Sequence, residues 1–256
     1  MAEVTYGADA LGVLNDEGGG GSRNEFSKFS SGTTYKVKVL GSADMMLYYG
    51  YSIYKKVNTF VAEKPSKKSA KGNPVEDLTP WDKAWKHHAD LSEEFQDEHS
   101  QEAYKYKPQQ RFAFGFYDLT EGKLIVVDLS KKQGQAIYKT IKKYEKKLDK
   151  MAFELSKEGS STNTTVSLSP LIDLEDDLTD KEQANFEMAP KEFDQSRFEG
   201  ILFEFNEQQM IEKLHEAGFD VTKIGYDVPQ PSSSDEKGEK ESAGEPLEIS
   251  DSDLPF

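Results

Sequence analysis

Aromatic rings and basic side chains gather in the middle of this 256-residue chain. Four tyrosines, Tyr48, Tyr49, Tyr51 and Tyr54, fall within seven residues and lead directly into Lys55–Lys56. Exposed rings stack on unpaired bases at roughly 1–3 kcal/mol each, and lysines beside them contact phosphates. The pattern is typical of a surface that binds single-stranded nucleic acid without sequence choice.

The alternation of a β-strand decides which of these tyrosines share a face. In an unbroken strand, Tyr49 and Tyr51 point to one side and Tyr48 and Tyr54 to the other. Gly50 favours a bulge, which would reset the alternation. Both faces therefore stay open as the contact surface.

Two further aromatic groups have both a structural and a ligand-binding interpretation. Phe112, Phe114 and Phe116 alternate, which is typical of a strand that lines a core. Trp81 and Trp85 lie one helical turn apart among lysines and histidines, so they form either a packed stripe or a contact surface. The predicted DNA-binding residues are Lys36, Lys38, Tyr48, Tyr49, Tyr51, Tyr54, Lys55, Lys56, Lys67, Lys68, Trp81, Trp85, Tyr104, Tyr106 and Arg111.

The net charge of −15 is distributed unevenly along the chain. Residues 33–157 contain 23 bases and 17 acids, a net charge of +6. Residues 158–226 contain 16 acids and five bases (−11), and residues 227–256 contain nine acids and two bases (−7). The middle segment is therefore the one expected to contact phosphates. The acidic segments favour an alternative: a protein-interaction factor or DNA mimic that does not bind DNA itself.

Hydrophobic patterning predicts a mainly β protein with added helices, an α+β fold. Residues 33–40 alternate as a strand, residues 45–57 as a strand or strand pair, and residues 111–129 as a hairpin. A helix begins after Thr79-Pro80 and extends to about residue 104. The other predicted elements are a helix at 137–155 whose lysines are either solvated or in contact with phosphates, a closing strand at 164–174, helices at 178–188 and 206–217, and a short strand at 200–205.

The last residues of the chain have the composition of a docking peptide. They follow a Pro/Ser/Gly-rich acidic stretch with too little apolar surface to fold by itself. A terminal Phe fills a pocket while carboxylates pair with basic residues at its rim. A disordered end that only improves solubility is the alternative. The predicted partner-binding residues are Asp251, Asp253, Leu254, Pro255 and Phe256.

More than half of the chain resembles the single-stranded DNA-binding (helix-destabilising) proteins of tailed phages. The resemblance is carried by SSGTTYKVKVLG at 30–41, by YYGYSIYKK, by RFAFGFYDLTEGKLIVVDLSKKQGQAIYKTI at 111–141 and by TTVSLSPLI at 164–172. The acidic tip ending in Pro-Phe resembles the tip of bacterial single-stranded DNA-binding proteins.

The resemblance implies an OB-fold barrel core at 30–226, with a loop-helix subdomain inserted at about 63–107. It implies a flexible N-terminal arm at 1–29 and a disordered acidic tail at 227–256. The implied function is to protect and hold open unpaired DNA in phage replication, recombination and repair. The implied partners are single-stranded DNA, further copies of the chain on DNA, and a polymerase, helicase/primase or recombination factors recruited by the tail. The implied location is the cytoplasm of an infected bacterium.

No catalytic or cofactor motif is evident, so we expect a binding protein and not an enzyme. Some members of the family hold zinc in the insertion, but here the insertion lacks cysteine and its histidines form no evident ligand set. The glycines at 18–21 lack the Lys-Ser/Thr of a phosphate-binding loop. The carboxylates at 173–177 suggest either a metal-dependent nuclease or, as we expect, a solvated turn. No membrane span or secretory signal is recognisable, and disulfides are excluded because the chain has no cysteine.

Overall fold

The computed structural model describes residues 24–94, 96–160 and 163–229. The fold is mixed α+β and is dominated by one eight-stranded sheet, as the coarse fold class predicted. The strands of this sheet are β1 (Thr34–Lys38), β2 (Met45–Ile53), β3 (Val57–Ala62), β6 (Gln109–Asp118), β7 (Lys123–Ser130), β8 (Phe153–Glu158), β9 (Thr165–Pro170) and β10 (Glu204–Phe205). A separate hairpin is formed by β4 (Lys67–Lys68) and β5 (Pro74–Glu76). The helices are α2 (Pro80–Leu91), α3 (Glu98–Tyr106), α4 (Lys131–Tyr144), α5 (Leu174–Asp177), α6 (Asp180–Met188) and α7 (Glu207–Glu216), with 3-10 turns η1 (Glu145–Lys150), η3 (Gln195–Phe198) and η4 (Val221–Ile224).

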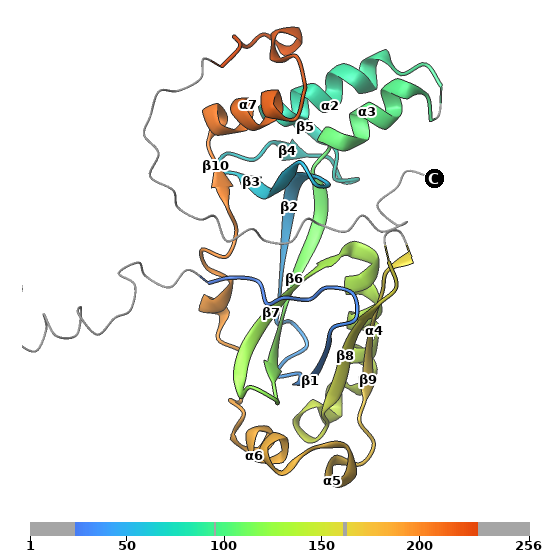
Figure 1. The fold of residues 1–256 in the computed structure, drawn as a ribbon, viewed down its shortest axis with the longest axis vertical. Helices are drawn as coiled ribbons and strands as arrows, with labels where there is room; N and C mark the ends of the chain where they lie inside the picture. The colour runs from blue at the N-terminus through green and yellow to red at the C-terminus, as the bar shows by residue number, and fades with distance from the viewer. Residues whose placement is uncertain (1–23, 95, 161–162, 230–256) are drawn as a thin grey trace, which may run out of the picture.

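Strand β6 holds the two ends of the molecule together. One of its edges pairs with β2 at residues 109–114 and with β1 at residues 117–118, while β7 pairs along the other edge. The strand order is β10-β3-β2-β6-β1-β8-β9. In Figure 1, α2, α3 and α7 lie at the end with β3 and β10, and α4, α5 and α6 lie at the end with β1, β8 and β9.

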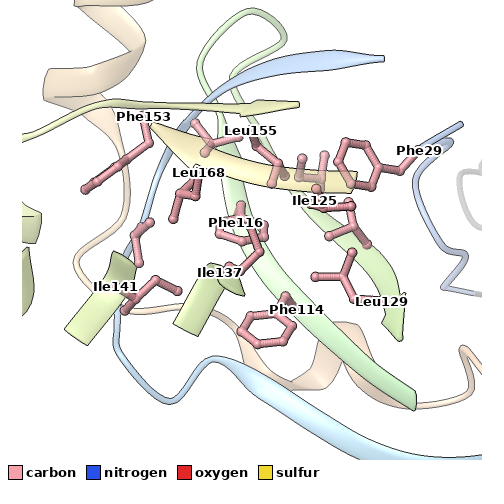
Figure 2. Close-up of a cluster of buried hydrophobic side chains, with 14 of the residues drawn as sticks. Phe29, Phe114, Phe116, Ile125, Leu129, Ile137, Ile141, Phe153, Leu155 and Leu168 are labelled. Atoms are coloured by element: carbon pink, nitrogen blue, oxygen red, sulfur yellow. The ribbon is translucent and has the colours of Figure 1, made fainter. Parts of the chain in front are cut away.

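The main core lies between the sheet and α4. Phe114 and Phe116 point into it from β6, Ile137 and Ile141 from α4, and Phe153 from β8 (Figure 2). The prediction that the alternating phenylalanines line a core is confirmed for Phe114 and Phe116, whereas Phe112 is only partly buried at its margin. A second cluster packs α2 and α7 on the opposite end of the sheet around Phe60 and Trp81.

The sheet is not a closed barrel, contrary to the barrel closure predicted from sequence. Strand β9, expected to close it, pairs with β8, and within the described residues no pairing joins it to β7. The segment before β1 contacts both β7 and β8. Ser27 N donates to Val126 O of β7 (2.8 Å), Gly32 N donates to Lys157 O of β8 (2.7 Å), and the Phe29 ring is buried in the main core. Two backbone hydrogen bonds and the packing of the Phe29 ring therefore connect this segment to β7 and β8, where a closed barrel would have paired strands.

Two predicted helices are shorter than expected. The helix predicted to reach residue 104 is divided into α2 and α3, because Asp97 accepts a hydrogen bond from Ser100 N and caps a new helix. The helix predicted at 137–155 begins earlier, at a Ser130 capping box, and ends at Tyr144. Leu155, the last residue of the predicted helix, instead lies in β8 and pairs with Tyr35. The helical spacing of apolar residues continued by chance past the end of α4, so the first part of the buried strand β8 was predicted as helix.

The second face of β6 and β7 is covered by the chain segment around η3. Phe193, Phe198 and Ile201 are buried against Ala113 and Val126. A Cβ atom on Gly115 would overlap the Phe193 ring, so glycine is required there by close packing. No helix in the described ranges is both long and apolar enough to cross a bilayer.

We predict that Gly115→Val lowers the unfolding free energy by about 1–3 kcal/mol, because the added methyl groups collide with Phe193. Urea denaturation measures this loss. In a Phe193→Ala background the same substitution should cost much less, since the ring is gone. An equal loss in both backgrounds would show that another contact makes the glycine necessary.

Candidate nucleic-acid interface

An open strip of the sheet face lies between the two ends of the molecule. Leu47 is paired with Phe112, and Tyr49 is paired with Gln110. Directly paired residues point to the same face of a sheet, so these four side chains lie together. Leu47 is 48% exposed, and the other three are half-buried. We call these four residues the strip.

The β4–β5 hairpin lies over one end of the strip. Lys68 Nζ is 4.4 Å from the centre of the Tyr49 ring, within the range of a cation–π interaction. A Cβ atom on Gly72 would be 3.7 Å from the same ring, and Gln110 Nε2 donates to the Tyr49 hydroxyl at 3.4 Å. Burial lowers the pKa of Lys68, and the nearby Asp82 carboxylate opposes this. The hairpin thus brings a lysine onto an aromatic ring of the sheet.

The first turn of α4 lies at the other end of the strip. A Cβ atom on Gly134 would be 3.6 Å from Phe112 Cβ, so the helix approaches the strip closely. Lys131 and Lys132 begin this helix directly after Ser130, and both are exposed. Lysines are therefore placed at both ends of an apolar and aromatic surface.

A buried group of polar side chains positions the β4–β5 hairpin. The Tyr51 hydroxyl donates to Asp82 at 3.0 Å, and the Ser66 hydroxyl, just before β4, donates to the same carboxylate. Thr79 N donates to Ser66 Oγ at 3.0 Å. Because β2, β4 and α2 meet in this network, the hairpin is fixed relative to Tyr49.

Five of the predicted DNA-binding residues are buried in this structure, which does not present them to a DNA strand. Trp81 has no exposed surface, and its Nε1 donates to Met210 O at 2.9 Å. The Tyr51 hydroxyl is in the Asp82 network, and Tyr106 packs against Trp81. Beyond the strip, helices α2, α3 and α7 cover β2. The rings of Tyr51, Trp81 and Tyr106 therefore belong to the core beneath these helices. The five buried residues are Tyr48, Tyr51, Trp81, Tyr106 and Arg111.

Tyr48 and Arg111 lie on the covered face of the sheet. The Tyr48 hydroxyl donates to Asp128 at 2.7 Å, and Arg111 pairs with the same carboxylate at 2.6 Å. Burial, followed by the Asp128 charge, raises the pKa of Tyr48 well above its usual range. Register through Gly50 is regular with β6, and the irregularity expected there occurs between Tyr51 and Ile53. Alternation therefore sends Tyr49 to the strip and Tyr48 to the opposite face.

Lys36 and Lys38 contact α6 and the segment before it. Lys36 Nζ lies 2.9 Å from Glu182 and donates to Asp177 O at 2.7 Å. Lys38 Nζ donates to Phe186 O at 3.0 Å and lies 4.0 Å from the centre of that ring. In the structure both lysines therefore hold a helix on β1, and neither lies at the strip.

The other predicted residues are accessible but scattered. Tyr54, Lys55 and Lys56 are exposed in the turn between β2 and β3, beside a surface pocket that Lys105 also lines. Lys67 is exposed and pairs with Glu76 at 2.9 Å. Trp85 and Tyr104 are half-buried on α2 and α3. Among the predicted residues, only Tyr49 and Lys68 are brought together at the strip.

Sequence reasoning missed several residues of this surface. Leu47 was not predicted as a contact residue because the prediction used only aromatic and basic residues. Phe112 was assigned to the core together with Phe114 and Phe116, with which it alternates along the strand. Lys131 and Lys132 follow a buried strand, and the Ser130 capping signal that starts their helix could have placed them at the end of the sheet.

Metal-ligating side chains are dispersed over the described residues. In the ranges that the structure covers, no three metal-ligating side chains come together. His88 and His99 do approach, with their Nδ1 atoms 3.2 Å apart, so one ring donates and the other accepts. The predicted partner-binding tip, Asp251 to Phe256, lies outside the described residues.

Comparison with protein-family models, with curated proteins and with solved structures found no match to this chain. Arguments about its function therefore depend on the residues and geometry above.

We predict a pH-dependent contribution of Glu182 to stability. Burial by itself raises the pKa of this carboxyl, but hydrogen bonds from Lys36, Thr179 and Thr120 outweigh it and lower the pKa to about 2. A pKa below the ordinary value means that the charged group stabilises the fold at neutral pH and that this contribution is lost as pH falls from about 4.5 towards 2.

Glu182→Gln should therefore lower the unfolding free energy at neutral pH, and the difference from the wild type should shrink in acid. Urea unfolding at about pH 7 and about pH 3 measures both differences. Glu187→Gln, at an exposed position on the same helix, is the matched control. A Glu182→Gln deficit that stays constant with pH would contradict this explanation.

Proposed function

We propose that this protein binds single-stranded DNA without sequence choice and holds it unpaired during replication, recombination and repair. The observation that carries the proposal is the half-exposed Tyr49 ring beneath Lys68, next to Leu47 and Phe112 on one sheet face. Bases stack on such rings, and the lysines at both ends of the strip supply charges for phosphates. The proposed role is one of binding, with no chemical step.

Preference for the unpaired state follows from this chemistry. Tyr49 and Phe112 offer ring faces, and a base exposes its own face only when it leaves the duplex stack. The strip residues Leu47 and Gln110 are uncharged, so no carboxylate on the strip repels a phosphate. The phosphate contribution of Lys68, Lys131 and Lys132 should weaken with added salt.

We further propose that the β1 end of the molecule is an OB-type core. The β6–β7 hairpin leads through α4 to β8, which returns to pair with β1, and β9 follows as a fifth strand. OB folds are partly open Greek-key barrels of five strands that bind oligonucleotides. The connectivity and the resemblance to phage DNA-binding proteins support this proposal. The sheet departs from a closed barrel because, in the described part of the chain, β7 and β9 are not paired.

We predict that Tyr49→Ala weakens binding to oligo-dT by about 5- to 150-fold, the range expected for losing one stacked base. Fluorescence titration against oligo-dT and a matched duplex measures this loss. The control is Tyr226→Ala, which removes a half-buried tyrosine outside the strip. Tyr117→Ala is unsuitable because Tyr117 is buried. Unchanged affinity of a folded Tyr49→Ala protein would remove the strip from the binding site.

A gel shift with the wild-type protein tests the competing function. The acidic segments favour a DNA mimic that occupies another protein's groove, and such a protein would shift no single-stranded oligonucleotide. A shift that weakens as salt is added supports DNA binding instead.

We also propose that the acidic tail recruits replication proteins. The sequence of its last six residues supports this, since Phe256 and the carboxylates of Asp251 and Asp253 suit an apolar pocket with a basic rim. Deleting residues 232–256 should abolish pull-down of a polymerase or helicase partner and should raise DNA affinity at low salt. Phe256→Ala in the full chain separates docking from charge, because it leaves every acidic side chain in place. Partner capture that survives both changes would contradict this role.

A further inference from the structure

Another tyrosine–lysine pair, with an exposed ring, lies on α4, the helix that begins at the strip. The Tyr138 ring is 38% exposed, and Lys142 Nζ is 6.0 Å from its centre. The pair repeats, at a longer distance, the arrangement of Tyr49 and Lys68. At 1.5 Å per residue, Tyr138 lies about 10 Å along the helix from Lys131. A strand that leaves the strip at Lys131 would therefore reach another aromatic ring.

The charge of α4 and η1 is strongly positive and faces outward. Residues 131–150 contain eight lysines and two carboxylates, a net charge of +6 in a chain of net charge −15. All eight lysines are exposed. Of these, Lys142 pairs with Glu145 at 2.8 Å, and within the described residues none of the other seven forms an ion pair within 4.0 Å. Most of this charge is therefore available to an outside anion.

The buried side of α4 explains why the lysines cannot turn inward. Ile137 and Ile141 face the main core (Figure 2), and the buried Gly134 lies against Phe114 and Phe112, so these contacts fix the rotation of the helix about its axis. Lys139 and Lys143, spaced four residues apart, consequently lie on the opposite side. This side is held in place by the core and needs no rearrangement to bind.

We infer that α4 and η1 form a second contact surface for the same DNA strand, with Tyr138 as a stacking position and the lysines as phosphate contacts. This inference rests on the proposed function and deepens it: the substrate is a single strand long enough to cover both the strip and α4. Short oligonucleotides fill only the strip. A strand of nucleotides is the occupant that fits best, because the surface combines an exposed ring with a row of cations on the helix that begins beside the strip.

The test compares two lengths of oligo-dT in the full-length protein. One is about 8 nucleotides, within the usual site size of one OB-type domain, and the other is several times longer. The triple variant Lys139→Ala, Lys143→Ala, Lys146→Ala should bind the short oligonucleotide like the wild type. For the long one, the slope of log affinity against log salt should fall by about 2, since each phosphate contact on single strands contributes about 0.7. Tyr138→Ala should weaken binding of the long oligonucleotide alone, by about fivefold or more.

A matched control removes the same amount of charge elsewhere. Lys123, Lys181 and Lys191 are also exposed, and they lie around the β6–β7 turn and α6. Their replacement by Ala should leave the salt slope unchanged, and circular dichroism and urea midpoints check that every variant folds. An equal effect of both triple variants would reduce the result to net charge and overturn the inference.

Three other outcomes have separate meanings. If the wild type binds neither oligonucleotide, the proposed function itself fails. If it binds both and the α4 variants behave like the wild type, only the second surface is wrong. If the α4 variants keep DNA binding but lose binding to poly-glutamate, α4 is a surface for an acidic polypeptide and the inference is overturned.

Discussion

The alternation of side chains along β6 is the constraint on which the rest of the structure depends. This strand pairs with β2, β1 and β7, so each of its side chains must suit one of two different surroundings. Phe114 and Phe116 fill the core beneath α4, while Gly115 on the other face leaves room for Phe193. A shift of one residue would exchange these sets and bring phenylalanine against phenylalanine where glycine is needed.

The same alternation creates the candidate interface. Phe112 continues the row of Phe114 and Phe116, but it lies beyond the middle of the core, where α4 only begins. Its neighbour Leu47 on β2 is 48% exposed, and the β4–β5 hairpin contacts Tyr49. The strip is thus the part of a continuous apolar face that the helices leave open. An apolar surface that stays open beside lysines is suited to stacked bases with charged backbones.

The fold decides which lysines of the basic segment are exposed and which contact other parts of the protein. The lysines of α4 point outward because the other side of the helix is buried in the core. Lys36 and Lys38, from the same basic segment, instead form hydrogen bonds with residues of α6. Glu182 of the later, acidic segment therefore pairs with Lys36 of the basic segment, and α6 packs against this part of β1. The exposed lysines of α4 begin with Lys131 and Lys132 beside one end of the strip, and Lys68 lies over the other end.

The amino-acid sequence by itself determined the α+β class, the β6–β7 hairpin, the Thr79 helix cap, the helix that begins near Asn206 and the segregation of charge. These are local properties, because periodicity, capping and composition act over a few neighbouring residues. Tertiary structure alone decided which rings are exposed. Tyr48, Tyr49 and Tyr51 are indistinguishable by type and spacing, yet Tyr48 meets Asp128, Tyr51 meets Asp82 and Tyr49 stays at the open strip. Their surroundings come from residues 19 to 80 positions away in the chain, so no local pattern could assign them.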